Sequence, residues 1–307
     1  MERIQSAEEL EKILTDRRVA ELASKPPPEV FNTDTLRATH RHIFQDFRKF
    51  DQLLSPSPGE FRDPLRSGDW SKMRDLQSVP LRSYTCYSPM DAASRAELDD
   101  VLKTAQPERL SKLPPKEFAK EISALYAHLD YIHPFENGNS RTLRTFTKNL
   151  ARASGYSLQW ETLAKTPQDQ DLLALARDRA TGEIAKDRLR NEDNAPFIES
   201  SLRKFAKHPR LEELVSEITR PSRAVAFEAE DKQTALQRHP ELASSYALMR
   251  SVALQAEADG YTMRERAAII TRARQNIVAA LDRGDIPAVQ LKEEHRRAPA
   301  RDHDLSR

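Results

Sequence analysis

A stripe of apolar residues at helical spacing runs through the middle of this sequence and stops at a proline. The stripe steps by four, three, four and three residues, and it consists of Phe118, Ile122, Leu125, Leu129 and Ile132. This spacing is typical of one face of an amphipathic α-helix. His133 and Pro134 follow directly, and proline disfavours helical backbone in the residue before it. The sequence therefore predicts a helix that ends at a histidine.

Helical spacing recurs on both sides of this stripe. Ser6 and Glu9 are placed as a capping box, and the helix that they open must end before Pro26. Further helical stripes are expected after Asn32, after residue 138 as far as Gly155, and after Thr262 as far as Gly284. The fold class is therefore expected to be all-α.

Residues 55 to 91 break the helical pattern. Seven prolines and glycines fall within this window, at positions 56, 58, 59, 64, 68, 80 and 89. Only Arg82 to Tyr87 has good strand propensity. We expect irregular structure here, with at most one short hairpin.

Length and composition exclude several classes of protein. The 307 residues allow about two domains. No apolar run approaches the roughly 18 residues of a membrane span, and Glu2 and Arg3 stand where a signal peptide would be apolar. The single cysteine, Cys86, fits a reducing compartment. The charge is balanced, with 49 Lys and Arg against 48 Asp and Glu, so nucleic acid is not indicated as a partner and neither is a membrane. We expect a cytoplasmic protein, unless a machine that reads another signal exports it.

The composition shifts toward Ala, Glu, Arg and Leu after about residue 205. Residues 206–290 are therefore expected to form a separate helical appendage. Residues 291–307 carry many charges and almost no apolar side chains, so they are expected to be a disordered tail.

One segment, residues 133–144, gathers residue types that suit phosphate chemistry. It places His133 before a loop and a new helix start at about Asn139. Free N–H groups at a helix start form an anion site, and Gly138 lets a ligand approach the backbone. Arg141 and Arg144 lie three residues apart, on one side of the new helix. The grouping predicts a general base beside a bound polyphosphate.

Each of these residues also has an ordinary structural interpretation. A His-Pro pair followed by Asn-Gly is a common turn, and arginines are common on helix surfaces. Their convergence on a single helix start favours the functional interpretation. His40, by contrast, shares the apolar face of its helix, so a hydrogen-bonded core histidine is expected there.

The same segment resembles the signature of the Fic family, H-P-F-x-[D/E]-G-N-G-R-x-x-R. The residues that match are His133, Pro134, Phe135, Gly138, Asn139, Arg141 and Arg144. Weaker similarity extends upstream, through Leu36 to Asp46 and the turn from Gly59 to Arg62, and downstream to Trp160. The resemblance covers about residues 1–205 and implies a Fic-type helical domain with a small β-hairpin flap.

What the resemblance implies is transfer of AMP from ATP to a Ser, Thr or Tyr hydroxyl of a target protein. His133 would be the base. Gly138, Asn139 and Ser140 would cradle phosphates beside Phe135, Arg144 would hold the terminal phosphate, and Arg141 would lie near the α and β phosphates. A flap of this kind aligns the target by strand pairing. Tyr84, Thr85, Cys86 and Tyr87 are the candidate flap residues, with the edge of a core strand as the alternative.

Two positions depart from the signature. Asn137 stands where an acidic Mg²⁺ ligand is usual, so weaker metal binding is expected. Ser140 replaces a glycine, which leaves phosphoryl transfer open. We therefore carry three hypotheses: an adenylyltransferase, a Fic-type phosphotransferase, and a binding module of low activity on the same scaffold.

Restraint of the activity is the last expectation from the resemblance. Many Fic proteins are silenced by a helix that bears [S/T]-x-x-x-E-[G/N], and this sequence contains no such hexad. The resemblance then implies a separate small antitoxin that carries the hexad, and a toxin or an exported effector as the role of this chain.

Overall fold

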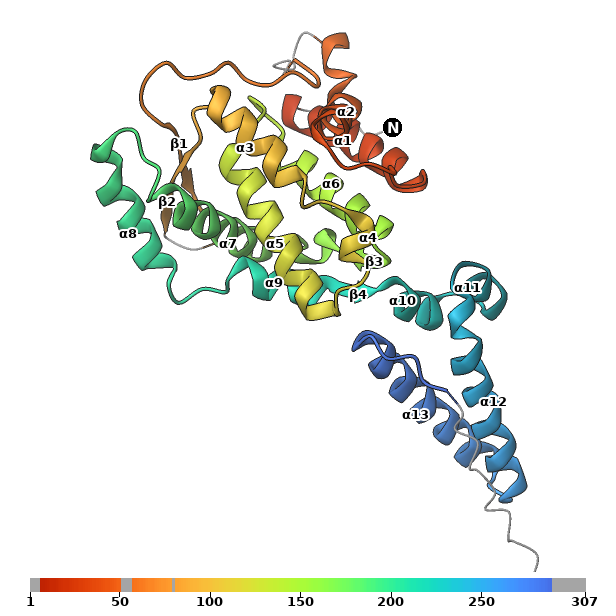
Figure 1. The fold of residues 1–307 in the computed structure, drawn as a ribbon. Coiled ribbons are helices and arrows are strands. Elements are labelled where there is room, and N and C mark those ends of the chain that lie inside the picture. Colours follow the sequence, from red (N-terminus) through yellow and green to blue (C-terminus); the bar gives the residue numbers. More distant parts are fainter. Residues whose placement is uncertain (1–5, 51–56, 79–80, 289–307) are drawn as a thin grey trace, which may run out of the picture. The chain divides into compact units, whose positions relative to one another are not determined.

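The computed structural model describes residues 6–50, 57–78 and 81–288 (Figure 1). The described residues divide into two compact units, one within 6–226 together with 282–284, and one of 227–281 together with 285–288. The expected tail, 291–307, lies outside the described residues.

The first unit is built mostly of helices, as expected. Its elements are α1 (Ala7–Ser24), α2 (Thr33–Phe44), η1 (Phe47–Lys49), β1 (Trp70–Asp75), β2 (Arg82–Tyr87), α3 (Ala92–Leu102), α4 (Pro107–Leu110), α5 (Pro115–Ile132), α6 (Asn139–Ala153), β3 (Tyr156–Leu158), η2 (Trp160–Leu163), α7 (Pro167–Ala185), η3 (Glu192–Asn194), α8 (Ala195–Phe205), α9 (Leu211–Ile218) and β4 (Thr219–Pro221).

The helix limits follow the capping signals in the sequence. Ser6 accepts a hydrogen bond from the backbone N–H of Glu9 at 3.1 Å, and Asn32 accepts one from Thr35 at 3.0 Å. α1 stops at Ser24, just before the proline run. α5 stops at Ile132, so the predicted end at His133 is confirmed.

α5 is the central helix of the first unit. Figure 1 shows it with α3, α6, α7 and α9 around it, and it packs against each of them. Its apolar stripe is buried, and Phe118 and Tyr126 are among the largest side chains with almost no exposed surface. The helix that carries His133 at its end is therefore held on several sides.

A short antiparallel hairpin accompanies the helices. β1 pairs with β2 from Trp70 opposite Tyr87 to Asp75 opposite Arg82. The predicted strand Arg82–Tyr87 is confirmed, and α7 and α8 pack against it. A second small pair, β3 with β4, was not expected from the sequence.

The first unit extends beyond residue 205, where the composition changes. α9 buries Leu211, Leu214, Val215 and Ile218 and packs against α5 and α7. These apolar contacts join the segment after residue 205 to the core of the first unit.

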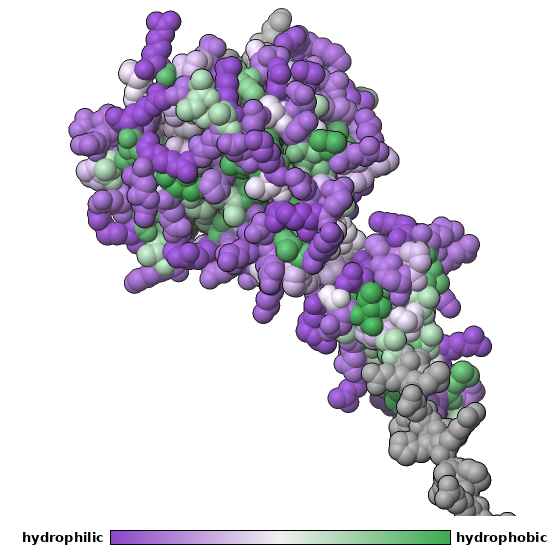
Figure 2. All heavy atoms as spheres, viewed as in Figure 1, coloured by the Kyte–Doolittle hydropathy of each residue, from purple (hydrophilic) through white to green (hydrophobic). Residues whose placement is uncertain are grey.

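The second unit is helical. Its elements are α11 (Lys232–Arg238), η4 (Pro240–Leu242), α12 (Ala243–Ala258) and α13 (Met263–Asp282), and the boundary between the units falls within α10 (Ser222–Ala229). The predicted capping box is present, because Glu265 accepts from the N–H of Thr262 at 2.8 Å and Thr262 accepts from that of Glu265 at 3.4 Å. No helix in the described ranges has the length and apolarity to cross a bilayer. Hydrophilic side chains cover most of the surface seen in Figure 2.

Candidate active site

His133 lies in an unusual backbone conformation at the end of α5. Its φ of 49° and ψ of 58° place it in the left-handed region, and its N–H still donates to Leu129 O at 3.1 Å. A residue with a Cβ adopts this conformation rarely, at a free-energy cost of roughly 1–2 kcal/mol. The chain therefore turns sharply out of the helix at the candidate base.

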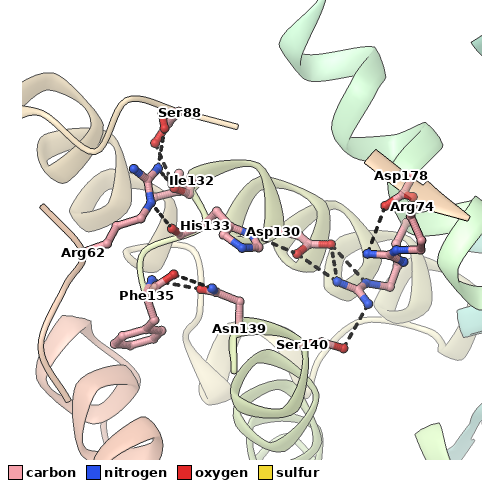
Figure 3. A network of polar contacts seen from close by, with 11 residues as sticks. Arg62, Arg74, Ser88, Asp130, Ile132, His133, Phe135, Asn139, Ser140 and Asp178 are labelled. Carbon is pink, nitrogen blue, oxygen red and sulfur yellow. Dashed lines mark hydrogen bonds and ion pairs between the residues drawn. The ribbon is translucent and has the colours of Figure 1, made fainter. Parts of the chain in front are cut away.

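Arg62 holds this turn from the side (Figure 3). Its Nε donates to His133 O at 2.7 Å, its Nη2 donates to Ser88 O and to Ile132 O, the latter at 3.4 Å, and its own N–H donates to Pro134 O at 2.9 Å. Hydrogen bonds from a charged donor are stronger than those between neutral groups. One buried guanidinium thus stabilises the strained turn.

Asn139 closes the loop that follows. Its Oδ1 accepts from Phe135 N at 3.0 Å, and its Nδ2 donates to Phe135 O at 2.6 Å. Asn139 and Phe135 are both buried. The two side chains therefore shape the loop from inside, and neither is free to reach a ligand in this structure.

His40 is a core histidine that contacts the loop between His133 and α6. Its ring stacks on Phe135 with centroids 3.9 Å apart. Its Nδ1 accepts from Gly59 N at 2.8 Å, so Nε2 carries the proton that it donates to Asn137 O at 3.1 Å. Burial lowers the pKa of His40 to about 4, which keeps the ring neutral. The expectation of a hydrogen-bonded core histidine is confirmed.

Gly138 is required by both backbone and space. Its φ is +76°, and a Cβ at this position would overlap the ring of Phe44. α6 begins at the next residue, and no side chain caps its first N–H groups. The start of α6 therefore keeps the donors and the positive dipole end that bind anions.

Arg141 and Arg144 line a cavity of about 210 Å³ beside α6, together with Lys148, Arg152 and Trp160. Arg141 is already engaged, because it donates to Thr15 Oγ1 at 3.1 Å and forms an ion pair with Glu11 of α1. Arg144 donates to Ser140 O at 3.3 Å and forms no ion pair within the described ranges. Arg144 is therefore the more available of the two cations.

The imidazole of His133 is enclosed. Burial lowers its pKa, and the nearby carboxylate of Asp130 opposes that shift. The ring of Tyr87 lies with its centroid 4.0 Å away. At neutral pH His133 is uncharged, which is the state that a general base needs.

Asp130 and Arg177 form a buried ion pair beside His133. Arg177 donates through Nε at 3.0 Å and through Nη2 at 2.8 Å to Asp130 Oδ2, and its Nη1 donates to Ser140 Oγ at 2.9 Å. Burial raises the pKa of Asp130, but Arg177 and His133 outweigh this effect, and the pKa lies below its usual range. The hydroxyl of Ser140 thus has a protein partner (Figure 3).

The candidate flap residues lie on the inner strand of the hairpin. Thr85, Cys86 and Tyr87 are buried, and Tyr84 donates from its N–H to Ser201 Oγ at 3.0 Å. The inner side of the hairpin is tied to α7, because Ser83 Oγ donates to Asp178 at 2.6 Å and Arg74 lies 3.7 Å from the same carboxylate. Within the described ranges nothing pairs with the outer edge of β1, so β1 is the strand open to an added chain.

Asn137 offers one neutral oxygen to a metal ion. Its side chain is exposed, and the described ranges hold no group of three or more His, Cys, Asp or Glu placed for a metal ion. A Mg²⁺ ion bound at Asn137 would take further oxygen ligands from the phosphates of the nucleotide.

Sequence reasoning missed Asp130, Arg177 and the role of Arg62. Asp130 lies three residues before His133, in the last turn of α5, so its short distance in sequence is the signal that could have placed it near the histidine. Arg177 is distant in sequence, and only the packing of α7 against α5 brings it to the site.

Comparison with known proteins relates part of the chain to one family. Residues 30–151 match the Fic/DOC family. A protein adenylyltransferase of Bartonella henselae is 28% identical over 151 residues, which are 49% of this chain and 27% of that protein. The protein adenylyltransferase VbhT of Bartonella schoenbuchensis is 36% identical over 61 residues, 20% of this chain and 13% of VbhT. The chain thus spans well under half the length of these two relatives.

Two further matches cover a larger share of the protein to which this chain is compared. A probable protein adenylyltransferase, y4lH of Sinorhizobium fredii, is 28% identical over 153 residues, 49% of this chain and 67% of that protein. The BepC effector of Bartonella tribocorum, solved with AMPPNP, aligns with a TM-score of 0.46 and 18% identity, covering 70% of this chain and 86% of that one.

We expect Gly138→Ala to destabilise the first unit more than Gly155→Ala. Both glycines have left-handed backbone, with φ of +76° and +79°, so both variants bear the strain of roughly 1–2 kcal/mol. Only at Gly138 does the new Cβ meet another side chain, which adds about 1–3 kcal/mol. Urea unfolding followed by tryptophan fluorescence measures the difference, and equal midpoints for the two variants would contradict the close contact with Phe44.

Proposed function

We propose, on the premise that residues 30–151 are a Fic/DOC domain, that this protein transfers AMP from ATP to a hydroxyl side chain of a target protein. The proposal takes its reaction from the names of the three curated relatives, each of which is called a protein adenylyltransferase. The observation that carries it is the placement of a neutral, enclosed His133 at the end of α5, with only the loop of residues 134–138 between it and the uncapped start of α6.

The chain's own residues have distinct tasks in this reaction. His133 takes the proton of the target hydroxyl, whose oxygen then attacks the α-phosphorus of ATP as pyrophosphate leaves. The N–H groups at the start of α6 offset the charge on the phosphates. Arg144 binds the terminal phosphate. Mg²⁺ would contribute charge neutralisation, with Asn137 as its one ligand from this segment.

The free edge of β1 suits the target. An extended peptide can add to an open strand through main-chain hydrogen bonds. The outer edge of β1 is open among the described residues, and β2 behind it is fastened to α7 and α8. We therefore assign target docking to β1, with Tyr84 to Tyr87 as its backing strand.

Phosphoryl transfer is the second candidate. The observation that favours it is Ser140, whose hydroxyl is bonded to Arg177 instead of being absent as in a glycine. A side chain at this position changes the space around the phosphates. A binding module of low activity is the third candidate, motivated by the weak metal ligand at Asn137.

We also propose that the chain acts as a toxin or as an exported effector. The lack of an inhibitory hexad in the sequence supports this role. The partner would be a small antitoxin whose hexad glutamate pairs with Arg144, which forms no ion pair within the described ranges.

His133→Ala is expected to abolish labelling of target proteins by ATP that carries ³²P in the α position, because the base is lost while the fold is retained. His128→Ala is the matched control, since His128 bonds only its own helix, at Ala124 O. The assay uses purified protein and a cell lysate. Label from the γ position alone would show phosphoryl transfer, and equal labelling by His133→Ala and wild type would refute the assigned base.

Arg144→Ala is expected to weaken ATP binding about 10- to 100-fold, as the loss of a charged hydrogen bond of 1.5–3 kcal/mol implies. Arg109→Ala is the control, because Arg109 pairs with Glu121 on the surface. Isothermal titration with ATP gives both affinities. Binding as tight as that of wild type would remove Arg144 from the phosphate site.

Expression of the chain in bacteria is expected to slow growth, and His133→Ala is expected to restore it, because unrestrained modification of essential proteins is toxic. Growth curves of the two strains at matched protein levels measure this. Equal growth, with transfer activity present in vitro, would exclude the toxin role and favour an effector whose targets lie in another cell.

A further inference from the structure

We propose that Asp130 is a positioning residue for His133: held in place by Arg177, it keeps the imidazole proton on Nδ1 and stabilises the imidazolium that forms when Nε2 takes the target's proton. This inference rests on the proposed function of the same site. It concerns how this chain prepares its base, and it assigns roles to two residues outside the motif.

The geometry of α5 brings the carboxylate to the ring. Asp130 lies three residues before His133, and its Oδ1 is 3.8 Å from His133 Nδ1. Nδ1 is buried and has no hydrogen-bond partner among the described residues. Only 12% of the His133 side chain is exposed, and Nδ1 is not part of that surface. The opposite nitrogen, Nε2, is therefore the one that can meet a substrate.

Arg177 fixes the carboxylate. It donates to both oxygens of Asp130, to Oδ1 at 3.0 Å and to Oδ2 at 2.8 and 3.0 Å. The two side chains are 9% and 2% exposed. Ser140 Oγ accepts a hydrogen bond from Nη1, the third nitrogen of the guanidinium, so Arg177 is also bound to the start of α6. A carboxylate bound in this way cannot rotate away from the histidine.

The ring itself has little freedom to turn. Tyr87 of β2 lies against it with an interplanar angle of 34°, and Arg62 holds its carbonyl. Arg62 thus stabilises the left-handed backbone of His133, and Tyr87 limits the rotation of its ring. Nδ1 therefore stays on the side of Asp130.

Asp130 is the carboxylate that faces the ring at close range. Charged and titratable groups from several elements surround the ring of His133. They are Asp130 of α5, Arg62 of the loop before β1, Lys72 of β1, Tyr87 of β2 and Arg177 of α7. Arg74 and Asp178 lie beyond Tyr87. Arg62 and Lys72 oppose a positive charge on His133, whereas Asp130 favours it. The carboxylate thus offsets the cations at the moment the base becomes charged.

Before transfer the ring of His133 is neutral, because burial lowers its pKa. During transfer the target's O–H bond breaks and an N–H bond forms at Nε2, while the oxygen bonds to the α-phosphorus and the bond to pyrophosphate breaks. The ring is then a cation next to a carboxylate in a buried site, where attraction between charges is strong. A similar arrangement of an aspartate behind a histidine base is known in hydrolases.

Asp130→Asn tests the inference in the full chain. The asparagine keeps the shape and removes the charge. We expect kcat on the pH plateau to fall at least 10-fold with little change in KM for ATP. Activity requires neutral His133, so it rises with pH through the pKa of this residue. Without the carboxylate that pKa is lower, and the acid limb moves to lower pH.

A second variant addresses folding. Asp130→Asn leaves Arg177 buried without its partner, which is destabilising. The double variant Asp130→Asn with Arg177→Gln removes both charges, and its plateau kcat is expected to stay at least 10-fold below that of wild type. Asp46→Asn is the matched control, because Asp46 is a buried carboxylate bonded to Arg18 at 2.6 Å, away from the ring. Its acid limb is expected to coincide with that of wild type.

Nitrogen NMR of the histidine side chains gives a readout that does not need activity. Wild type is expected to show His133 with the proton on Nδ1, identified by the loss of its signal in His133→Ala. Both Asp130 variants are expected to lose this tautomer preference, and the single variant also to lower the pKa of His133.

The two failures are distinguishable. A changed tautomer and pKa without any AMP transfer would overturn the proposed function and leave the contact in place. Transfer with an unshifted acid limb and an unchanged tautomer in Asp130→Asn would overturn the role of Asp130. A parallel loss of activity at all pH values, with the limb unmoved, would likewise overturn it, because that is the signature of a purely structural residue.

Discussion

The guanidinium of Arg62 is the contact on which the geometry of the site depends. Three successive carbonyl groups, those of Ile132, His133 and Pro134, accept from this one residue, and Ser88 O is the fourth acceptor. The left-handed backbone at His133 has an intrinsic cost, and charged hydrogen bonds in a buried place offset it. This turn changes the direction of the chain at the end of α5 and leads it toward Gly138. The candidate base and the start of α6 are neighbours because this turn is sharp.

The helical part of the fold was predictable because its signals are local. Capping residues such as Ser6 and Asn32 and the apolar stripe of α5 act within a few residues, so the sequence shows them directly. A short hairpin was expected in this region, but the position of β1 was not, because Trp70 to Asp75 has neither alternation nor strong strand propensity and becomes a strand by pairing with β2. The partners of His133 divide in the same way. Asp130 is three residues from His133 in the sequence, whereas Arg177 reaches the site only through tertiary packing.

Ser140 shows why a departure from a signature must be judged in three dimensions. In the sequence it is an extra side chain beside the expected phosphates. In the structure its hydroxyl accepts from Arg177, which in turn holds Asp130. The serine therefore belongs to a polar network that a glycine could not join.

Two adjacent residues of α7 face different parts of the site. Arg177 grips the aspartate behind the histidine, and Asp178 accepts Ser83 of the hairpin at 2.6 Å. Adjacent residues of a helix keep a fixed spacing, so α7 connects the strand pair to the end of α5, where the candidate base His133 lies. If a target docks on the hairpin as proposed, the strand pair that receives it and the aspartate beside the candidate base are held by the same helix.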